Sequence, residues 1–113
     1  FLADPARDHS QDMDERDFYA HQNPDYEQPW DRVECDAAEV LHRGEIGRMR
    51  HPDGEETYDT TDAEELAAFI VDGWLNSEGH REVILDPVFE RGGVGVHIND
   101  GEFWVTAMFC ESE

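Results

Sequence analysis

Residues 73–81 read GWLNSEGHR, and the rest of the chain is organised around this stretch. A helical pattern of apolar residues leads into it, and a glycine-rich strand and hairpin lead out of it to the C-terminus. Ser77 and Gly79 interrupt the helical pattern, and we expect Gly79 to let the chain turn. His80 then stands at a loop exit, where its side chain can point into a polar cavity.

Two helices are predicted beside this stretch. Thr61 and Glu64 form a capping box, and apolar residues three and four positions apart then predict a helix that ends near Ser77. A short helix over 80–85 is stopped by an Asp-Pro pair. The apolar positions of the longer helix are Leu66, Phe69, Ile70, Gly73 and Trp74.

A further helix is predicted near the N-terminus, with Asp4 as its N-cap, Pro5 at its first helical position and its end near Arg16. We expect Tyr26 and Trp30 to pin the following loop to the body of the protein. The inward face of this helix carries Ala6, His9 and Met13.

The middle of the chain, residues 42–60, is polar and rich in glycine. We interpret it as an exposed connection in which His42 and His51 are solvated.

A hairpin is predicted near the C-terminus, with a strand over 92–98, a turn over 99–101 and a return strand over 102–110, which is apolar on both faces. The glycines of 92–95 lack the lysine and the helix of a phosphate loop, and they indicate close backbone approach instead. Helices on both sides of this hairpin predict an α+β fold, a three-layer α-β-α sandwich with a central antiparallel sheet, in one domain over residues 1–113.

The charge balance is strongly acidic, with 29 Asp and Glu against 8 basic residues, all of them Arg, and a net charge of −21. One interpretation is an acidic protein kept soluble by its charge. The other, which we favour, is adaptation to molar salt, where the screening length falls to about 3 Å and self-repulsion is tolerated. The lack of a basic stripe argues against nucleic acid as a partner, and no apolar run is long enough to span a membrane.

Two cysteines, Cys35 and Cys110, leave two alternatives open. A disulfide between them would close a long loop, worth roughly 4 kcal/mol in the chain-entropy model. Buried, reduced thiols are the other alternative.

Few residues suit catalysis. No Gly-x-Ser-x-Gly motif occurs, neither cysteine has an electropositive setting, and no two histidines have metal-ligand spacing. His9 and His97 are interpreted as hydrogen-bonded structural histidines. His21 and His80 stand at loop exits, and Glu39, inside an apolar stretch, would be unfavourable to bury unless paired, with histidine as its obvious partner.

Segments in the order of the whole chain resemble the prokaryotic branch of the CAP superfamily, also called SCP-like, which includes cysteine-rich secretory proteins, antigen 5 and pathogenesis-related 1 proteins. The most specific segment is W-x-x-S-x-G-H-R at 74–81, followed by G-V-G-V at 93–96; the others are 6–13, 18–21 and 38–41. Together with the acidic composition, this suggests a haloarchaeal member. The resemblance implies an α-β-α sandwich, secreted or surface-attached, with a cavity of two histidines and up to two acids that binds a divalent cation in several members.

Carried over to this chain, the resemblance implies His21, Glu39 and His80 as ligands of zinc or magnesium. Ser77 stands at the family's second acidic position, so a four-ligand site is incomplete. The residues after Glu39 are Val and Leu where the family has Asn and Ile, and we expect the family's first helix to be absent upstream of Phe1.

The sequence therefore favours a secreted or cell-surface binding or interaction domain, with a small molecule, lipid or protein as ligand, over an enzyme. One alternative is a metal-assisted hydrolase with Glu39 or a cavity histidine as general base. The other is a purely structural surface domain, in which the polar trio forms an internally satisfied network.

Overall fold

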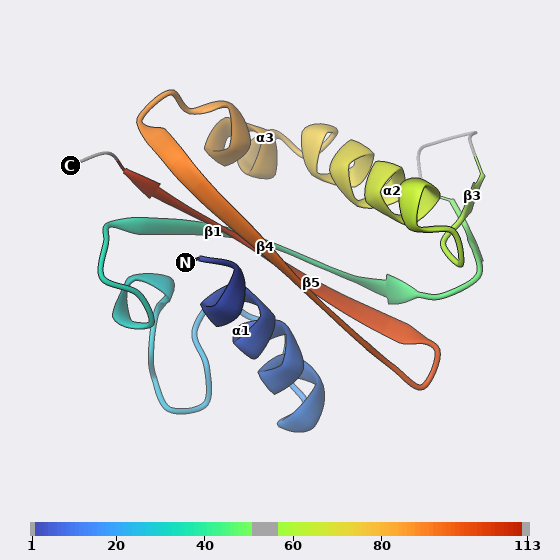
Figure 1. Ribbon diagram of the computed structural model, residues 1–113, viewed down its shortest axis with the longest axis horizontal. Coiled ribbons are helices and arrows are strands. Elements are labelled where there is room, and N and C mark those ends of the chain that lie inside the picture. Colours follow the sequence, from blue (N-terminus) through green and yellow to red (C-terminus); the bar gives the residue numbers. More distant parts are fainter. Residues whose placement is uncertain (1, 51–56, 112–113) are drawn as a thin grey trace.

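The central sheet contains three antiparallel strands in the spatial order β1-β5-β4 (Figure 1), namely β1 (Ala37–Glu45), β4 (Phe89–Asn99) and β5 (Glu102–Glu111). This computed structural model describes residues 2–50 and 57–111. Strand β5 lies between the other two strands and pairs with both of them along its length.

Both faces of β5 are buried, as its sequence predicts. On one face, Phe103 and Val105 belong to a core that includes Trp74. On the other face, Trp104 packs with Met13. A strand that is apolar on both faces needs a layer on each side, and helices supply those layers, which confirms the α-β-α arrangement.

The β4–β5 turn forms as predicted. Asp100 and Gly101 both have positive φ, 52° and 79°, which is the backbone of the two-residue turn that matches the twist of a hairpin.

Helix α1 (Ala3–Glu15) covers one face of the sheet, and its backbone lies against β4. A Cβ atom on Gly93 would lie 2.5 Å from the Ala3 nitrogen, and one on Gly95 would overlap the Arg7 nitrogen. These overlaps confirm that the glycines permit close approach of backbone to backbone.

The start of α1 corrects the prediction. The helix begins at Ala3 with Leu2 as its N-cap, so Asp4 and Pro5 both lie inside its first turn. First-turn N–H groups have no partner within a helix, and proline there breaks no hydrogen bond. The buried Leu2 side chain fixes the entry of the helix against the sheet.

Helices α2 (Ala63–Leu75) and α3 (Glu78–Leu85) cover the opposite face of the sheet (Figure 1). The amphipathic pattern of α2 is confirmed, because Phe69, Ile70 and Trp74 are buried. Within residues 2–50 and 57–111, no helix has the length and apolar character needed to cross a bilayer.

Both ends of the α2–α3 unit differ in detail from the prediction. Asp62, and not Thr61, is the N-cap of α2, and its carboxylate accepts a hydrogen bond from the Glu65 backbone N–H at 3.1 Å. Gly79 lies in the first turn of α3, whose N-cap is Ser77. The chain therefore turns before Gly79, and a glycine is not what the turn requires.

The connection after β1 is more ordered than predicted. The short strands β2 (Arg48–Met49) and β3 (Tyr58–Asp59) pair with each other. Tyr58 is buried and its ring packs against α2. The prediction of an exposed connection is therefore wrong for this part. Burying the apolar ring of Tyr58 against a helix is favourable, and this outweighs the tendency of its polar neighbours to stay in solvent.

His42 is not solvated either. It lies on β1, half-buried, with its ring 5.4 Å from that of Phe69 and 5.9 Å from that of Phe103. His51 lies outside the described residues.

Tyr26 and Trp30 do not pin the loop after α1, since they are 81% and 56% exposed. Asn23 instead stabilises the loop from within: it is buried, and its side-chain oxygen accepts hydrogen bonds from the backbone N–H groups of Asp25 and Glu27. An asparagine that bonds its own following backbone stabilises a turn without an aromatic anchor. The loop then passes through a 3₁₀ turn, η1 (Pro29–Asp31).

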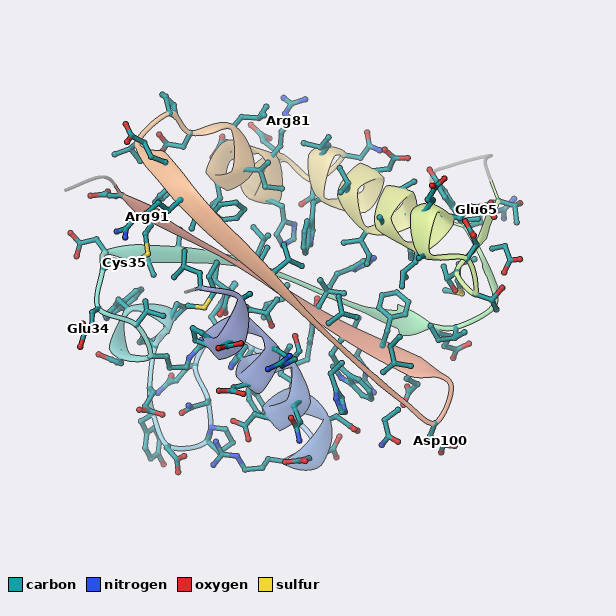
Figure 2. The ribbon with its side chains drawn as sticks, viewed as in Figure 1. Glu34, Cys35, Glu65, Arg81, Arg91 and Asp100 are labelled. Carbon is teal, nitrogen blue, oxygen red and sulfur yellow. A yellow bond between two sulfur atoms is a disulfide. The ribbon has the colours of Figure 1, made fainter. Side chains whose placement is uncertain are left out.

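Cys35 and Cys110 form a disulfide with their Cα atoms 5.8 Å apart. The bond joins the segment before β1 to the end of β5 near Arg91 (Figure 2). The disulfide therefore links the segment that leads into β1 to the C-terminal part of β5, at the end of the sheet where β1 begins.

Candidate functional site

Glu39 lies near the start of β1, and its side chain is fully buried. Its Oε1 accepts a hydrogen bond from His21 Nδ1 at 2.9 Å. Its Oε2 lies 3.0 Å from Nη1 of Arg32. An isolated buried carboxylate would be strongly destabilising, and these two groups supply the compensating donor and charge.

Arg32 follows η1 and reaches inward with only 10% of its side chain exposed. Besides the ion pair with Glu39, its Nη2 donates a hydrogen bond to the backbone carbonyl of His21 at 2.7 Å. The Nη1 and Oε2 atoms are close enough to attract, yet neither makes a geometrically aligned hydrogen bond. The guanidinium of Arg32 therefore balances the charge of Glu39 and also binds the backbone carbonyl of His21.

His9, on the inner face of α1, borders the same network. Its side chain is completely buried, and its Nε2 donates to the carbonyl of Ala20 at 2.9 Å while lying 3.8 Å from Glu39 Oε1. Burial lowers the pKa of His9, and this outweighs the opposing effect of the Glu39 carboxylate. His9 is thus a hydrogen-bonded structural histidine, as predicted.

His80, on α3, is half-buried, and its Nδ1 forms a hydrogen bond with Ser77 Oγ at 2.9 Å. Burial lowers the pKa of His80, and a smaller contribution in the same direction comes from the charge of His21.

The predicted site residues thus meet in two pairs, His21 with Glu39 and His80 with Ser77. The structure does not gather them around one point: among the described residues, no group of three or more His, Cys, Asp or Glu side chains is arranged to hold a metal ion. Metal binding by His21, Glu39 and His80 remains a prediction.

The donor atoms nonetheless favour one metal over the other. With Nδ1 donating to Glu39, the uncharged tautomer of His21 has its lone pair on Nε2. Ser77 occupies Nδ1 of His80 and leaves its Nε2. Imidazole nitrogen suits zinc, whereas magnesium prefers oxygen ligands.

Sequence reasoning missed Arg32. It identified Glu39 as needing a partner and named histidine, but a fully buried carboxylate calls for a permanent positive charge, which a guanidinium supplies. The available signal was that Arg32 is the only arginine between Arg16 and Arg43.

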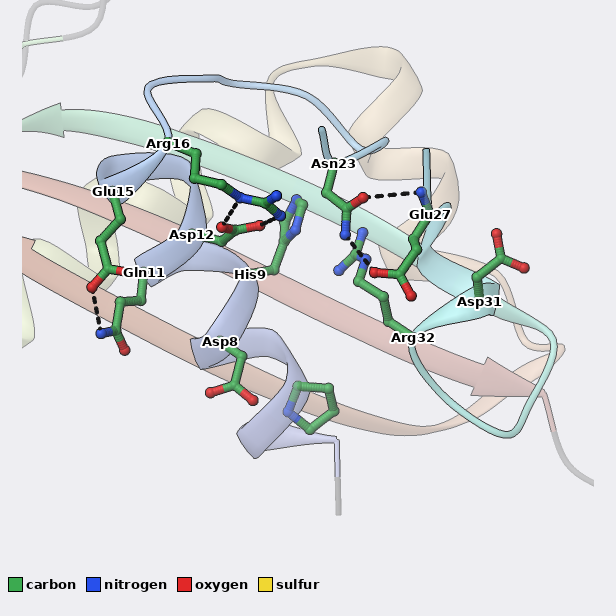
Figure 3. Close-up of a pocket in the computed structure, with 11 residues that line it drawn as sticks. Asp8, His9, Gln11, Asp12, Glu15, Arg16, Asn23, Glu27, Asp31 and Arg32 are labelled. Atoms are coloured by element: carbon green, nitrogen blue, oxygen red, sulfur yellow. Dashed lines mark hydrogen bonds and ion pairs between the residues drawn. The ribbon is translucent and has the colours of Figure 1, made fainter. Parts of the chain in front are cut away.

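A polar cavity of about 550 Å³ lies between α1 and the loop that carries Asn23 and Glu27 (Figure 3). His9 and Arg32 contribute to its wall, so the buried network borders solvent on this side as well. The amide of Asn23 donates to Glu27 at 2.8 Å and holds the outer wall together. The remaining lining residues are Pro5, Asp8, Gln11, Asp12, Glu15, Arg16 and Asp31.

Comparison with known proteins places these features in a family. The chain is 35% identical over 103 residues to the Bacillus subtilis (strain 168) protein YkwD, a match that covers 91% of this chain and 35% of the relative. It is 33% identical over 94 residues to the membrane protein YlbC of the same organism, covering 83% of this chain and 23% of the relative. The chain therefore spans about a third of these relatives or less.

Two solved structures share the fold. An extracellular protein containing a SCP domain from Bacillus anthracis str. Ames superposes with a TM-score of 0.60 at 27% identity, over 99% of this chain and 34% of the other. An outer surface protein from Borrelia burgdorferi superposes with a TM-score of 0.73 at 17% identity, over 99% of this chain and 74% of the other; at that identity the likeness concerns the fold alone. The family model of the cysteine-rich secretory proteins matches residues 2–109, and this chain belongs to that family, the CAP family.

Proposed function

We propose that this chain is an extracellular or cell-surface binding domain whose ligand site is formed around His21, Glu39 and His80. The observation that carries the proposal is the buried Glu39 carboxylate, which holds the ring of a half-exposed histidine in place. A carboxylate that orients a histidine ring is a recurring part of ligand and metal sites. The similar Bacillus anthracis protein with a SCP domain is extracellular, which supports the location.

Within this proposal, imidazole nitrogen donors suit zinc better than magnesium. Glu39 binds the Nδ1–H of His21, and a carboxylate in that position orients the opposite ring nitrogen toward a metal. His21 and His80 would hold the ion, with Glu39 and Ser77 fixing the two rings. Bound there, zinc would supply a Lewis-acidic centre for an oxygen or nitrogen atom of the ligand.

We rank the hydrolase alternative behind binding. A general base needs access to the proton that it removes, whereas the Glu39 side chain is fully buried and paired with Arg32.

A zinc titration tests the proposal. Thermal unfolding of the wild-type protein should shift upward with zinc, by the equivalent of about 2.7 kcal/mol at a zinc concentration 100 times Kd. The shift should vanish in His80→Ala and persist in the matched control His97→Ala, which removes a histidine from the far end of β4. Equal behaviour of wild type and His80→Ala would refute the zinc site and leave the three residues as a structural polar network.

We also propose that the chain is adapted to high salt, on the basis of its net charge of −21. Self-repulsion of this size weakens a compact state unless salt screens it. Circular dichroism at low salt and at molar KCl should show loss of native structure at the lower concentration. Identical spectra and melting temperatures at both concentrations would contradict salt adaptation.

A further inference from the structure

The polar cavity between α1 and the loop of residues 23–32 is separate from the site proposed above, because none of His21, Glu39 and His80 lines it. Its volume of about 550 Å³ falls in the range of about 300–1,000 Å³ that is usual for small-molecule sites. Every lining residue except Pro5 is polar or charged (Figure 3). We propose that this cavity binds a neutral saccharide, a ligand whose hydroxyl groups both donate and accept hydrogen bonds.

Two buried side chains on the cavity wall have polar atoms without a partner. The His9 side chain is completely buried, and its Nδ1 has no hydrogen-bond partner among the described residues. Only 10% of the Arg32 side chain is exposed, and its Nε–H likewise lacks an acceptor. His9 Nε2 donates to the Ala20 carbonyl, so Nδ1 of the neutral ring is an acceptor. Because unpaired buried polar atoms are unfavourable, the wall offers a bound molecule one acceptor and one donor.

The charges on the wall argue against an ionic ligand. Carboxylates such as those of Asp8 and Asp31 line the same cavity as the guanidinium groups of Arg16 and Arg32. An ammonium group can only donate, so it leaves the Arg32 Nε–H without an acceptor. A carboxylate can only accept, so it leaves His9 Nδ1 without a donor and is repelled by the acids. A hydroxyl group donates and accepts, and it carries no charge that must be removed from water.

The loop that supplies part of the wall also carries two exposed aromatic residues. Tyr26 and Trp30 are 81% and 56% exposed, and along the chain they alternate with the lining residues Asn23, Glu27 and Asp31. A sugar ring has apolar C–H faces between its hydroxyl groups, and aromatic side chains with a polar tip suit a ligand that is part apolar and part polar. Packing against such a ligand gives a role to two aromatic rings that do not anchor the loop.

Trp30 reports on binding by itself, because the other two tryptophans, Trp74 and Trp104, are only 6% and 3% exposed. The experiment titrates the protein with glucose, maltotriose and triacetylchitotriose, at a salt concentration where circular dichroism shows it folded. Intrinsic fluorescence and its quenching by acrylamide are followed. At least one saccharide should protect Trp30 from quenching, with a Kd of about 1 mM. No protection by any of them up to about 50 times that concentration, or a response to spermidine alone, would overturn the proposal.

Matched variants test the location of binding by NMR titration, which does not depend on tryptophan fluorescence. Asp8→Ala removes an exposed carboxylate of the wall and Trp30→Ala removes the exposed ring, and each should weaken binding roughly tenfold. The control Leu85→Ala removes an exposed apolar side chain from α3, across the sheet, and should leave the Kd unchanged. Wild-type affinity in both Asp8→Ala and Trp30→Ala would overturn the proposal. The result is independent of the zinc titration, since His80 does not line this cavity.

Discussion

Within residues 2–50 and 57–111, two histidine–carboxylate hydrogen bonds of nearly equal length occur. His21 lies 2.9 Å from Glu39, and His97 on β4 lies 2.8 Å from Asp14 on α1. The Glu39 side chain is fully buried, whereas those of Asp14 and His97 are 17% and 22% exposed. The buried pair has a guanidinium beside it, and the more exposed pair has the neutral amide of Asn99. The two hydrogen bonds have similar lengths, so the burial of the carboxylate, and not the length of its bond to histidine, decides whether it needs a guanidinium beside it.

The largest expected effect comes from removing that cation. Arg32→Ala leaves the buried Glu39 with His21 as its hydrogen-bond donor and without its guanidinium. We expect a loss of about 3 kcal/mol in the free energy of unfolding, because removing one partner of a buried ion pair leaves the other charge uncompensated. Chemical denaturation at constant high salt measures it.

The double variant Arg32→Met/Glu39→Leu should recover most of this loss, since removing both charges strands neither. As a control, Arg43→Ala breaks a half-exposed contact with Glu102 and should cost less than about 1 kcal/mol. Similar losses of unfolding free energy for Arg32→Ala and Arg43→Ala would show that burial does not make the Arg32–Glu39 ion pair more important for stability than the Arg43–Glu102 pair.

The next effect is a pH dependence of the free energy of unfolding, which comes from His9 beside the buried Glu39. Burial holds the pKa of His9 below its ordinary value of 6.5. As the pH falls below 6.5, the unfolded chain takes up a proton that the folded chain still refuses, so stability is lost between 6.5 and the folded pKa.

The variant His9→Gln should flatten this part of the stability profile, since glutamine does not titrate and its amide can still donate to the Ala20 carbonyl. Unfolding free energies measured about one pH unit above and one below the ordinary histidine pKa test it. If the wild type and His9→Gln lose the same stability on acidification, the proton uptake belongs to another group.

The smallest effect concerns the more exposed pair. The hydrogen bond from His97 lowers the pKa of Asp14 below its ordinary 3.8, with a lesser contribution from Asn99. A depressed carboxylate pKa stabilises the fold above the unfolded value and loses that contribution as the pH falls through the folded value. In His97→Ala, the Asp14 pKa should rise toward 3.8, as followed by NMR titration, with little change in stability at neutral pH. An unchanged Asp14 pKa would remove His97 as its cause.

The helices and the hairpin follow from the spacing of apolar residues and from turn residues, both of which can be read directly from the sequence. Apolar residues at helical spacing predict α2, and the apolar return strand predicts a sheet covered on both faces. The errors fall at element ends, where Asp62 caps in place of Thr61 and the chain turns at Ser77 in place of Gly79. Two adjacent residues of similar capping ability differ little in the helix stability that each would give as N-cap, so tertiary packing decides which of them takes that position.

Residue types, loop positions and family resemblance predict His21, Glu39 and His80 as site residues, but none of these signals contains a distance. The pairing of His21 with Glu39 follows the expectation that a buried acid binds a histidine. Arg32 does not follow from any local pattern, because it reaches Glu39 from a loop whose course depends on Asn23 and the η1 turn. The exposure of Tyr26 and Trp30 shows the same limit, since large aromatic residues in that loop were expected to be buried.

The sequence by itself determined the order of the elements, the two-sided burial of β5 and the glycines at 93 and 95 that let α1 approach the sheet, because periodicity and the absence of a Cβ are properties of the chain itself. Only the tertiary structure decided that Ser77 binds His80 and that a guanidinium completes the Glu39 pair. Those outcomes depend on which charges burial brings within a few ångströms of each other, and Coulomb energies at such distances in a low-dielectric interior are set by three-dimensional position rather than by spacing along the chain.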